Sequence, residues 1–171
     1  MIYIVRHGQT DWNKVGRMQG RTDIPLNKTG REQAREVGEK LKGIEFDKVF
    51  SSPLKRAYET AKIITNKPIE IDERLIERCC GELEGKTKNE IKIRPNFNSL
   101  TETMCGIEFL PDFKARIASF FDEILKEYPN KNILISTHAG VCLNARCYFE
   151  GEPENIEDYK LKNCEIITYK N

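Results

Sequence analysis

The chain has 171 residues, a length typical of one domain, and we expect residues 1–171 to form a single domain. Its 28 Lys and Arg residues balance 27 Asp and Glu residues, and this net charge of +1 argues against a nucleic-acid partner or a polybasic membrane surface. No apolar run approaches the ~18 residues of a membrane helix. The N-terminus also has no signal-peptide pattern, so we expect a cytoplasmic protein.

The six cysteines form no Cys-x-x-Cys pair, which removes support for a zinc ribbon or a thioredoxin-type motif. A disulfide framework is not expected in a chain without a secretory signal. We therefore expect free and mostly buried thiols at the following positions: Cys79, Cys80, Cys105, Cys142, Cys147 and Cys164.

Strand-like and helical segments alternate through the first half of the chain. The β-branched and apolar runs predict strands over 2–5, 48–51 and 69–71. Helices are expected over 29–42 and from 53 to about 65, the second with a proline in its first turn. The evidence for the first helix is an apolar face with i, i+3, i+4, i+7 spacing, made by Ala34, Val37, Gly38 and Leu41.

The second half begins with an irregular stretch over 76–110, where glycines and a proline break any long period. We expect loops there, with one short helix near 87–93. The most regular apolar stripe predicts a helix over 111–128. A strand over 132–136, a helix over 139–149 and a last strand over 165–169 follow.

This alternation predicts an α/β fold with three layers (α/β/α), in which helices cover both faces of a mostly parallel central sheet. Ligands of such sheets bind outside the carboxyl ends of the strands. Both histidines of the chain, His7 and His138, directly follow predicted strands, and each lies close to a glycine. Arg6 precedes His7, and the loop after a third strand leads to Arg56.

Two imidazoles and two guanidinium groups at one edge of a sheet suit phosphoryl transfer. The planar guanidinium group of arginine pairs with phosphate oxygens in a bidentate fashion. A neutral imidazole is a competent nucleophile near pH 7. The transition state of phosphoryl transfer needs mainly positioning and charge stabilisation, which these groups supply.

The motifs resemble those of the histidine phosphatase superfamily, in its phosphoglycerate mutase-like branch, and they follow the family's order over nearly the whole chain. One departure is Phe109, which stands where the family's Gly-Glu-Ser element has its serine. The matching segments are Arg6-His7-Gly8-Gln9-Thr10 with Trp12-Asn13, Pro25-Leu26 with Gly30, Ser51-Ser52-Pro53-Leu54 with Arg56-Ala57, Leu75 and Glu77 with Gly81-Glu82-Leu83-Glu84-Gly85, Gly106-Ile107-Glu108, and Ser136-Thr137-His138-Ala139-Gly140.

The resemblance implies a phosphomonoester hydrolase in which His7 is the nucleophile and forms a phosphohistidine intermediate. Arg6, Arg56 and His138 would hold the phosphoryl oxygens, and Asn13 would add a neutral hydrogen-bond donor. No cofactor and no metal ion are implied, because the arginines supply the positive charge. The expected partner is a small phosphate ester, and the sequence leaves the oligomeric state open.

Glu77 would protonate the leaving alcohol and then activate water. It lies in an acidic stretch, so an ordinary surface carboxylate is the alternative interpretation, with Glu82 or Glu84 in its place. Asn13 has a similar alternative as a turn residue.

Three other functions stay open at the level of the sequence. A zinc hydrolase could use His7 and His138 with Glu77 or Asp11, although the neighbouring arginines would repel the metal ion. A phosphate-binding protein without catalysis could use the same fold. A cofactor-dependent phosphoglycerate mutase would share the core residues, but the segment 86–100 has a single arginine, Arg94, and no Arg-Arg pair. We therefore favour a phosphatase.

The identity of the ester stays open among sugar phosphates, phosphoglycerate, nucleotides and α-ribazole phosphate. We expect the loops between about 87 and 110 to select it, and they carry no recognisable specificity motif.

Overall fold

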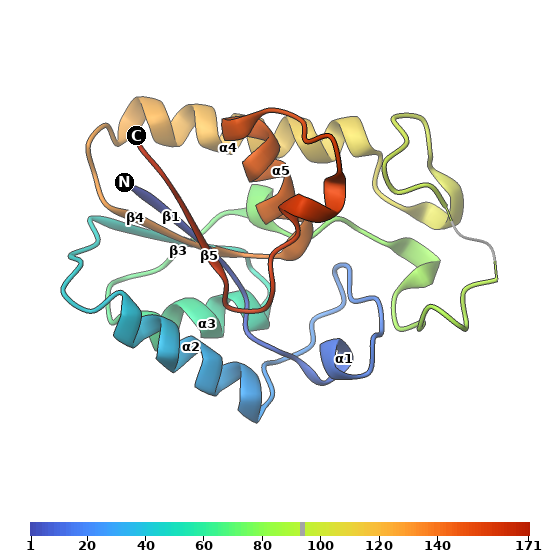
Figure 1. Ribbon diagram of the computed structural model, residues 1–171, viewed down its shortest axis with the longest axis horizontal. Helices are drawn as coiled ribbons and strands as arrows, with labels where there is room; N and C mark the ends of the chain where they lie inside the picture. Colours follow the sequence, from blue (N-terminus) through green and yellow to red (C-terminus); the bar gives the residue numbers. More distant parts are fainter. Residues whose placement is uncertain (93–94) are drawn as a thin grey trace.

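A five-stranded sheet forms the centre of the protein (Figure 1). The computed structural model describes residues 1–92 and 95–171. The strand order is β3-β2-β4-β1-β5, and all neighbours are parallel except β1 and β5, which are antiparallel. The strands are β1 (Ile2–Arg6), β2 (Lys48–Ser51), β3 (Glu70–Ile71), β4 (Ile133–Thr137) and β5 (Ile166–Tyr169).

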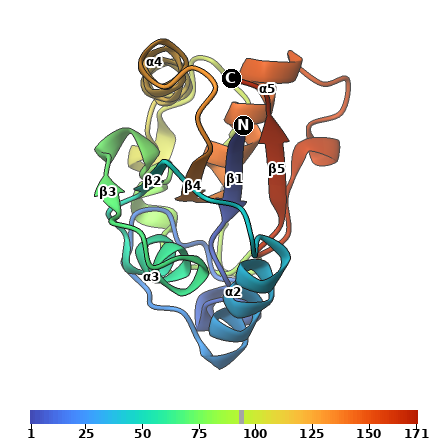
Figure 2. The ribbon, with the colours of Figure 1, turned by 90° about the vertical axis from the view of Figure 1, so that its left-hand side faces the viewer.

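Helices cover both faces of this sheet, as Figure 2 shows, with α2 and α3 on one face and α4 and α5 on the other. The α-helices are α1 (Asp11–Lys14), α2 (Lys28–Lys40), α3 (Lys55–Ile64), α4 (Leu110–Glu127) and α5 (Ala139–Glu150). Short 3-10 helices lie in the connections: η1 (Glu73–Leu75), η2 (Gly81–Leu83), η3 (Met104–Gly106) and η4 (Ile156–Tyr159). The predicted three-layer α/β fold with a mostly parallel sheet is confirmed.

Each face of the sheet has its own hydrophobic core, because successive side chains of a strand point to opposite faces. In β1, Ile2 and Ile4 pack in the core of α4 and α5, whereas Val5 packs with Val37 of α2 and Ala61 of α3. The two cores fix the helices on the sheet, so the loops that follow the parallel strands all emerge at one edge.

Two segments differ from the sequence-based expectations. Residues 87–92 form no helix, because the backbone of Thr87 pairs with that of Arg17 in an antiparallel bridge and only residues 88–90 form a turn. Residue 93, the expected end of that helix, lies outside the described residues. The helix expected from 53 begins at Lys55, after Ser52 Oγ has accepted a hydrogen bond from the Leu54 amide (3.3 Å).

The short helix α1 was not predicted, and a capping box between Thr10 and Asn13 forms it. All six cysteines are free thiols, but only Cys80 and Cys142 are buried, so the expectation of mostly buried thiols is wrong. Within the part of the chain that the structure describes, no helix has the length and apolar character needed to cross a membrane.

Candidate active site

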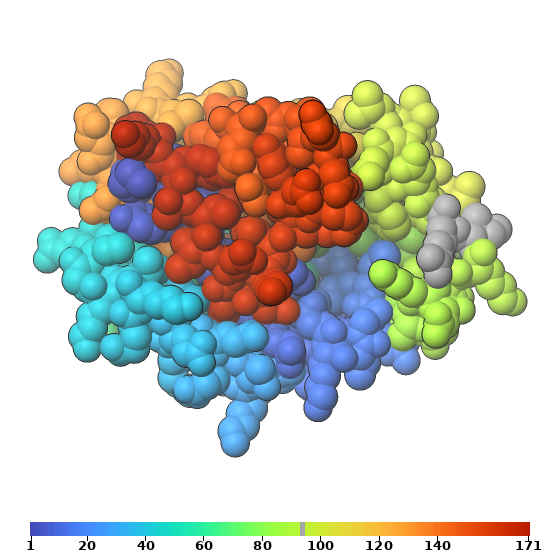
Figure 3. Space-filling view, in the orientation of Figure 1, coloured from blue at the N-terminus to red at the C-terminus, as the bar shows by residue number. Residues whose placement is uncertain are grey.

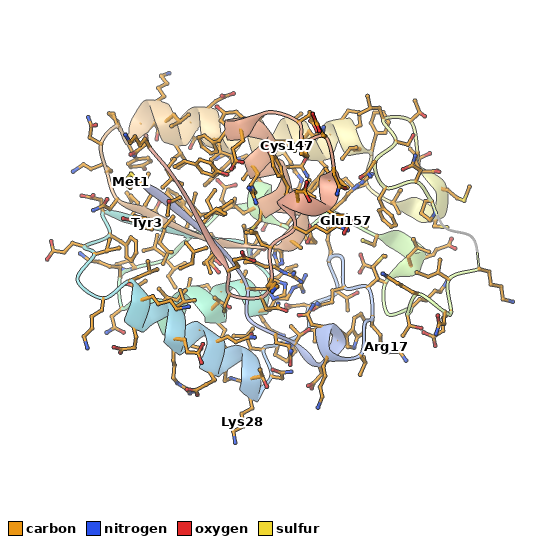
Figure 4. The ribbon with its side chains drawn as sticks, in the orientation of Figure 1. Met1, Tyr3, Arg17, Lys28, Cys147 and Glu157 are labelled. Atoms are coloured by element: carbon orange, nitrogen blue, oxygen red, sulfur yellow. The ribbon has the colours of Figure 1, made fainter. Side chains whose placement is uncertain are left out.

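A cavity of about 950 Å³ lies at the carboxyl ends of the parallel strands. Five of the six residues predicted for the site line it: Arg6, His7, Asn13, Arg56 and Glu77. In Figure 4, the labelled Arg17 lies beyond α1 and the labelled Glu157 lies in η4, and both also line this cavity. The space-filling view in Figure 3 shows the surface where the N-terminal segment after α1 (blue) meets the C-terminal segment that contains η4 (orange to red).

His7 follows the last residue of β1 and is almost completely buried (3% exposed). Its Nδ1 lies 2.7 Å from the carbonyl oxygen of Gly8. A carbonyl oxygen only accepts, so Nδ1 carries the proton of the neutral ring and the lone pair is on Nε2. Burial, with Arg56 and Arg6 nearby, holds the pKa of His7 well below its usual value. The imidazole is thus neutral and held in one orientation, with the lone pair on Nε2.

Two glycines allow the backbone around His7 to take this path. A Cβ on Gly8 would lie 2.4 Å from the carbonyl oxygen of Gly30, and a Cβ on Gly30 would lie 2.1 Å from that of Gln9. The loop after β1 therefore lies directly against the first turn of α2. The Gly8 amide also donates to Thr60 Oγ1 of α3 (3.1 Å), so both helices of this face hold the loop.

His138 follows β4 and is wholly buried behind the cavity, with its ring centroid 5.2 Å from that of His7. Its Nε2 lies 2.7 Å from the hydroxyl of Ser52. Its Nδ1 is buried and has no hydrogen-bond partner among the described residues. Burial and the positive charge of Arg56 keep the pKa of His138 well below its usual value, so this ring is also neutral.

Arg56 lies in the first turn of α3 and is wholly buried. Its Nη1 donates to the carbonyl oxygen of Thr22 (2.8 Å) and its Nη2 to that of Gly20 (2.7 Å). Its Nε is buried without a partner. Burial lowers the pKa of Arg56, but a guanidinium group stays charged in proteins. The group therefore keeps hydrogen-bond capacity for an anion.

Arg6, the last residue of β1, adds a second guanidinium group to the cavity. Its Nη1 donates to the carbonyl oxygen of Leu161 (2.5 Å), and its Nε is buried without a partner. Burial lowers the pKa of Arg6 from its ordinary value, and this group also stays charged. Two cations with unused donors thus flank His7.

Asn13 lies at the third position of α1, where its amide oxygen is already in use. That Oδ1 accepts from the Thr10 backbone amide (3.1 Å) and from Nδ2 of Asn163 (3.3 Å). The Nδ2 group of Asn13 is therefore the atom left for a ligand. Asn163 also donates to the carbonyl oxygen of His7 (2.9 Å). Asn163 lies 150 residues after Asn13 and 156 residues after His7 in the chain, which explains why the sequence did not reveal it.

Glu77 follows η1 and holds its carboxylate against the first turn of α5. Oε1 accepts from the Arg78 amide (2.9 Å), and Oε2 accepts from the Gly140 amide (3.0 Å), one of the free N–H groups at the start of a helix. A Cβ on Gly140 would lie 2.4 Å from Oε1. The backbone of Glu77 accepts from Arg21 (3.2 Å) and Arg116 (3.3 Å). The carboxylate therefore has a fixed place in the cavity wall.

The predicted site residues therefore come together around His7, with His138 behind the ring. Two walls of the cavity differ in how well the sequence predicted them. The segment 87–110 contributes, as expected, residues such as Lys88, Ile91 and Phe97. The segment 152–160 was not predicted and contributes Pro153, Ile156 and Lys160, among others. No motif marks this second wall, because its residues meet the site only through the fold.

A zinc hydrolase, one of the alternatives left open by the sequence, requires both histidines and a carboxylate to surround one metal ion. Across residues 1–92 and 95–171, no group of three or more His, Cys, Asp or Glu side chains is placed to hold a metal ion. The guanidinium groups of Arg56 and Arg6 are permanent positive charges that lower the pKa of both rings. This arrangement is complementary to an anion such as a phosphoryl group.

The chain belongs to the histidine phosphatase superfamily, branch 1, whose family model matches residues 2–170. It is 36% identical over 165 residues to an uncharacterized phosphatase, PhoE, of Bacillus subtilis, a match that covers 95% of this chain and 83% of that protein. It is also 31% identical to a 2,3-bisphosphoglycerate-dependent phosphoglycerate mutase of Gloeobacter violaceus, over 99% of this chain and 85% of the mutase.

A crystal structure of phosphoserine phosphatase from Entamoeba histolytica, in complex with 3-phosphoglyceric acid, has the same fold with a TM-score of 0.82. The two chains are 31% identical, and the match covers 96% of this chain and 87% of that one. These similarities identify the protein as a phosphatase of the histidine phosphatase family. They do not favour a phosphate-binding protein without catalysis.

Proposed function

We propose that this phosphatase hydrolyses phosphomonoesters in two steps, through a phosphohistidine on Nε2 of His7, with residues 1–171 acting as one catalytic domain. The observation that carries the proposal is the 2.7 Å hydrogen bond from Nδ1 of His7 to Gly8, since it leaves the Nε2 lone pair open. The low pKa of His7 keeps that lone pair available in mildly acidic solution as well.

In the first step, Nε2 of His7 attacks phosphorus and the bond from phosphorus to the ester oxygen breaks. Arg6 and Arg56 hold the phosphoryl oxygens with their unused N–H groups, and Nδ2 of Asn13 donates to the same group. The unpartnered Nδ1 of His138 is a further donor when Nε2 of that ring accepts from the Ser52 hydroxyl. The positive charge of the guanidinium groups stabilises the transition state.

Glu77 transfers the protons in both steps. In its protonated form it gives a proton to the departing ester oxygen, and the product alcohol leaves. In the second step its carboxylate takes a proton from water as that water attacks phosphorus and the bond to Nε2 of His7 breaks. Inorganic phosphate and the free imidazole are the products. The hydrogen bonds of Glu77 to Arg78 and Gly140 support this role, because they fix the carboxyl group.

Two further properties belong to this proposal. Catalysis needs neither a metal ion nor a cofactor, so turnover in excess chelator equals turnover without it, and a chelator-sensitive activity contradicts the proposal. The protein is cytoplasmic, which the six free thiols support, because disulfides are rare in that compartment.

A phosphoglycerate mutase is the second candidate, since relatives such as the protein of Gloeobacter violaceus have that name. The two activities differ in whether water or an acceptor alcohol meets the phosphohistidine. The absence of an Arg-Arg pair in the segment 86–100 favours water, although the one arginine of that segment, Arg94, lies outside the described residues.

The test supplies 3-phosphoglycerate with catalytic 2,3-bisphosphoglycerate and compares isomerisation with the release of phosphate from a panel of phosphomonoesters. We expect phosphate release to be the faster reaction on at least one ester of the panel. Isomerisation that is faster by orders of magnitude than every hydrolysis would show that the protein is a mutase.

A further inference from the structure

Glu84, just after η2, collects four hydrogen bonds on one carboxylate. Oε1 accepts from the backbone amides of Arg21 (3.0 Å) and Cys80 (3.0 Å). Oε2 accepts from the backbone amide (2.9 Å) and the hydroxyl of Thr22. Burial alone would raise the pKa of Glu84, but these hydrogen bonds outweigh it and hold the pKa below its usual value. Glu84 is therefore ionised, and its hydrogen bonds connect the segment 20–22 to the segment 80–84.

The segment 20–22 is also the segment that holds Arg56. The carbonyl oxygens of Gly20 and Thr22 are the two hydrogen-bond acceptors of the Arg56 guanidinium among the described residues. The amide of Thr22 points to Glu84 while its carbonyl points to Arg56. A shift of this turn would therefore move the guanidinium group.

Gly20 shows how closely the turn and the carboxylate fit. Its φ is +50°, a conformation that favours glycine, and a Cβ there would lie only 2.1 Å from Oε1 of Glu84. Glu84 itself does not line the cavity, and no hydrogen bond joins its described carboxylate to Arg56. The turn 20–22 is the segment that joins this carboxylate to Arg56 through hydrogen bonds, whereas the Glu84 charge acts on Arg56 directly through space.

We propose that Glu84 is a positioning residue for phosphoryl transfer, which fixes the turn 20–22 and thereby aims the Arg56 guanidinium group at the phosphoryl oxygens. This inference rests on the proposed function of Arg56. The carboxylate is needed because four donors converge on its two oxygens. In a glutamine, the NH₂ group would face either two backbone amides or the Thr22 amide and hydroxyl, so at least one backbone N–H would lose its acceptor.

The test compares wild type, Glu84→Gln, Arg56→Ala and the double variant with p-nitrophenyl phosphate as substrate and orthovanadate as inhibitor. Glu84→Gln is expected to lower kcat/KM roughly 10- to 100-fold and to weaken orthovanadate inhibition by a similar factor, because a small misplacement of a binding group has effects of this size. In the Arg56→Ala background the same substitution should change kcat/KM less than about twofold, since there is no guanidinium group left to aim.

An equal loss in both backgrounds, or no loss in the wild-type background, overturns the proposal. Asn13→Ala is the matched control background, because it removes another proposed phosphoryl ligand but leaves Arg56 in place. In this background Glu84→Gln should lower kcat/KM by the same factor as in wild type. Glu82→Gln, on the exposed side of the same 3-10 helix, should leave kcat/KM unchanged.

Folding and function can be separated in the same series. Thr22→Val removes one hydrogen bond of Glu84 and keeps its charge, so it should show a smaller loss with the same dependence on Arg56. Because the Glu84 charge is unchanged in Thr22→Val, a loss in this variant reports the position of the turn and not the charge, and it carries the test if Glu84→Gln does not fold. If Arg56→Ala retains wild-type kcat/KM, the proposed role of Arg56 is wrong, and the role of Glu84 fails with it. If Arg56→Ala loses activity and Glu84→Gln does not, only the positioning proposal fails.

Discussion

The chemistry of the site depends on two imidazoles that stay neutral beside two permanent cations. Burial disfavours the charged form of His7, and the guanidinium groups of Arg56 and Arg6 disfavour it further. The same causes act on His138. A protonated His7 would have no lone pair on Nε2, so the environment that is proposed to bind a phosphoryl anion also preserves the proposed nucleophile.

The proposed acid role of Glu77 predicts that the effect of removing it depends on the leaving group. Glu77→Gln should lower kcat about 10²- to 10⁴-fold on an alkyl phosphate, whose alkoxide needs a proton. It should affect the first step with p-nitrophenyl phosphate far less, because that phenolate departs unprotonated. Burst kinetics with both substrates measure this difference, with the exposed Glu82→Gln as control. Equal losses of first-step rate on the two substrates would argue against Glu77 as the acid.

The residues that the sequence predicted for the site are those that directly follow a strand or belong to a local motif. His7 and Arg56 are in the cavity because parallel strands end at one edge. Asn163, which donates to Asn13, was not singled out, and Ser52 was noted only as part of a motif and not as the partner of His138. Their roles depend on contacts between distant segments, and a single sequence carries no signal for such contacts.

At the scale of elements, the start of α5 is a support for the carboxyl group of Glu77. Gly140→Ala places a Cβ 2.4 Å from Oε1 of Glu77 and 3.3 Å from the ring of Phe113. The flexible carboxylate should move away, so we expect a loss of kcat of about tenfold or more on an alkyl phosphate with the fold retained.

The matched control for this element is Gly38→Ala in α2, where a Cβ would make only ordinary contacts, 3.5 Å from Ile64. It should leave kcat unchanged and stabilise the protein by up to about 1 kcal/mol through helix propensity. Steady-state kinetics and thermal melts of both variants provide the comparison. If Gly140→Ala keeps wild-type kcat, the close fit between α5 and Glu77 has no importance for catalysis.

The regular elements were predictable because their apolar periods match the two faces of the sheet. The stripe of α4, with Phe113, Ile117 and Phe120, lies in one core as expected. The 3-10 helices and α1 were not predicted, since single turns carry no period. The sequence predicted a helix near 87–93, where the structure has none over 87–92. The bridge that prevents it joins Arg17 and Thr87, which are 70 residues apart, and a local sequence pattern does not reveal such a pairing.

For the whole molecule, the placement of both histidines in one buried site predicts how stability depends on pH. In the unfolded chain each histidine binds a proton below about pH 6.5, whereas in the folded protein both rings stay neutral. The unfolded state then binds more protons, so the free energy of unfolding should fall as the pH drops below about 6.5. The decrease should approach about 1.4 kcal/mol per pH unit for each histidine.

Urea denaturation at a series of pH values between about 7 and 5 measures this slope, in a window above the range in which carboxylates titrate. His7→Gln should reduce the slope, because His138 is the only other histidine of the chain. A free energy of unfolding that is constant over this window would contradict the low pKa values of the two rings.

The central claim is a covalent phosphohistidine on Nε2 of His7, and rapid acid-free quenching of the enzyme with a ³²P-labelled phosphomonoester tests it most directly. We expect a label on His7 that is stable in base and labile in acid, that forms and decays at rates consistent with turnover, and that is absent from His7→Ala. A label on serine, cysteine or aspartate, or steady turnover by His7→Ala at the wild-type rate, would contradict the account.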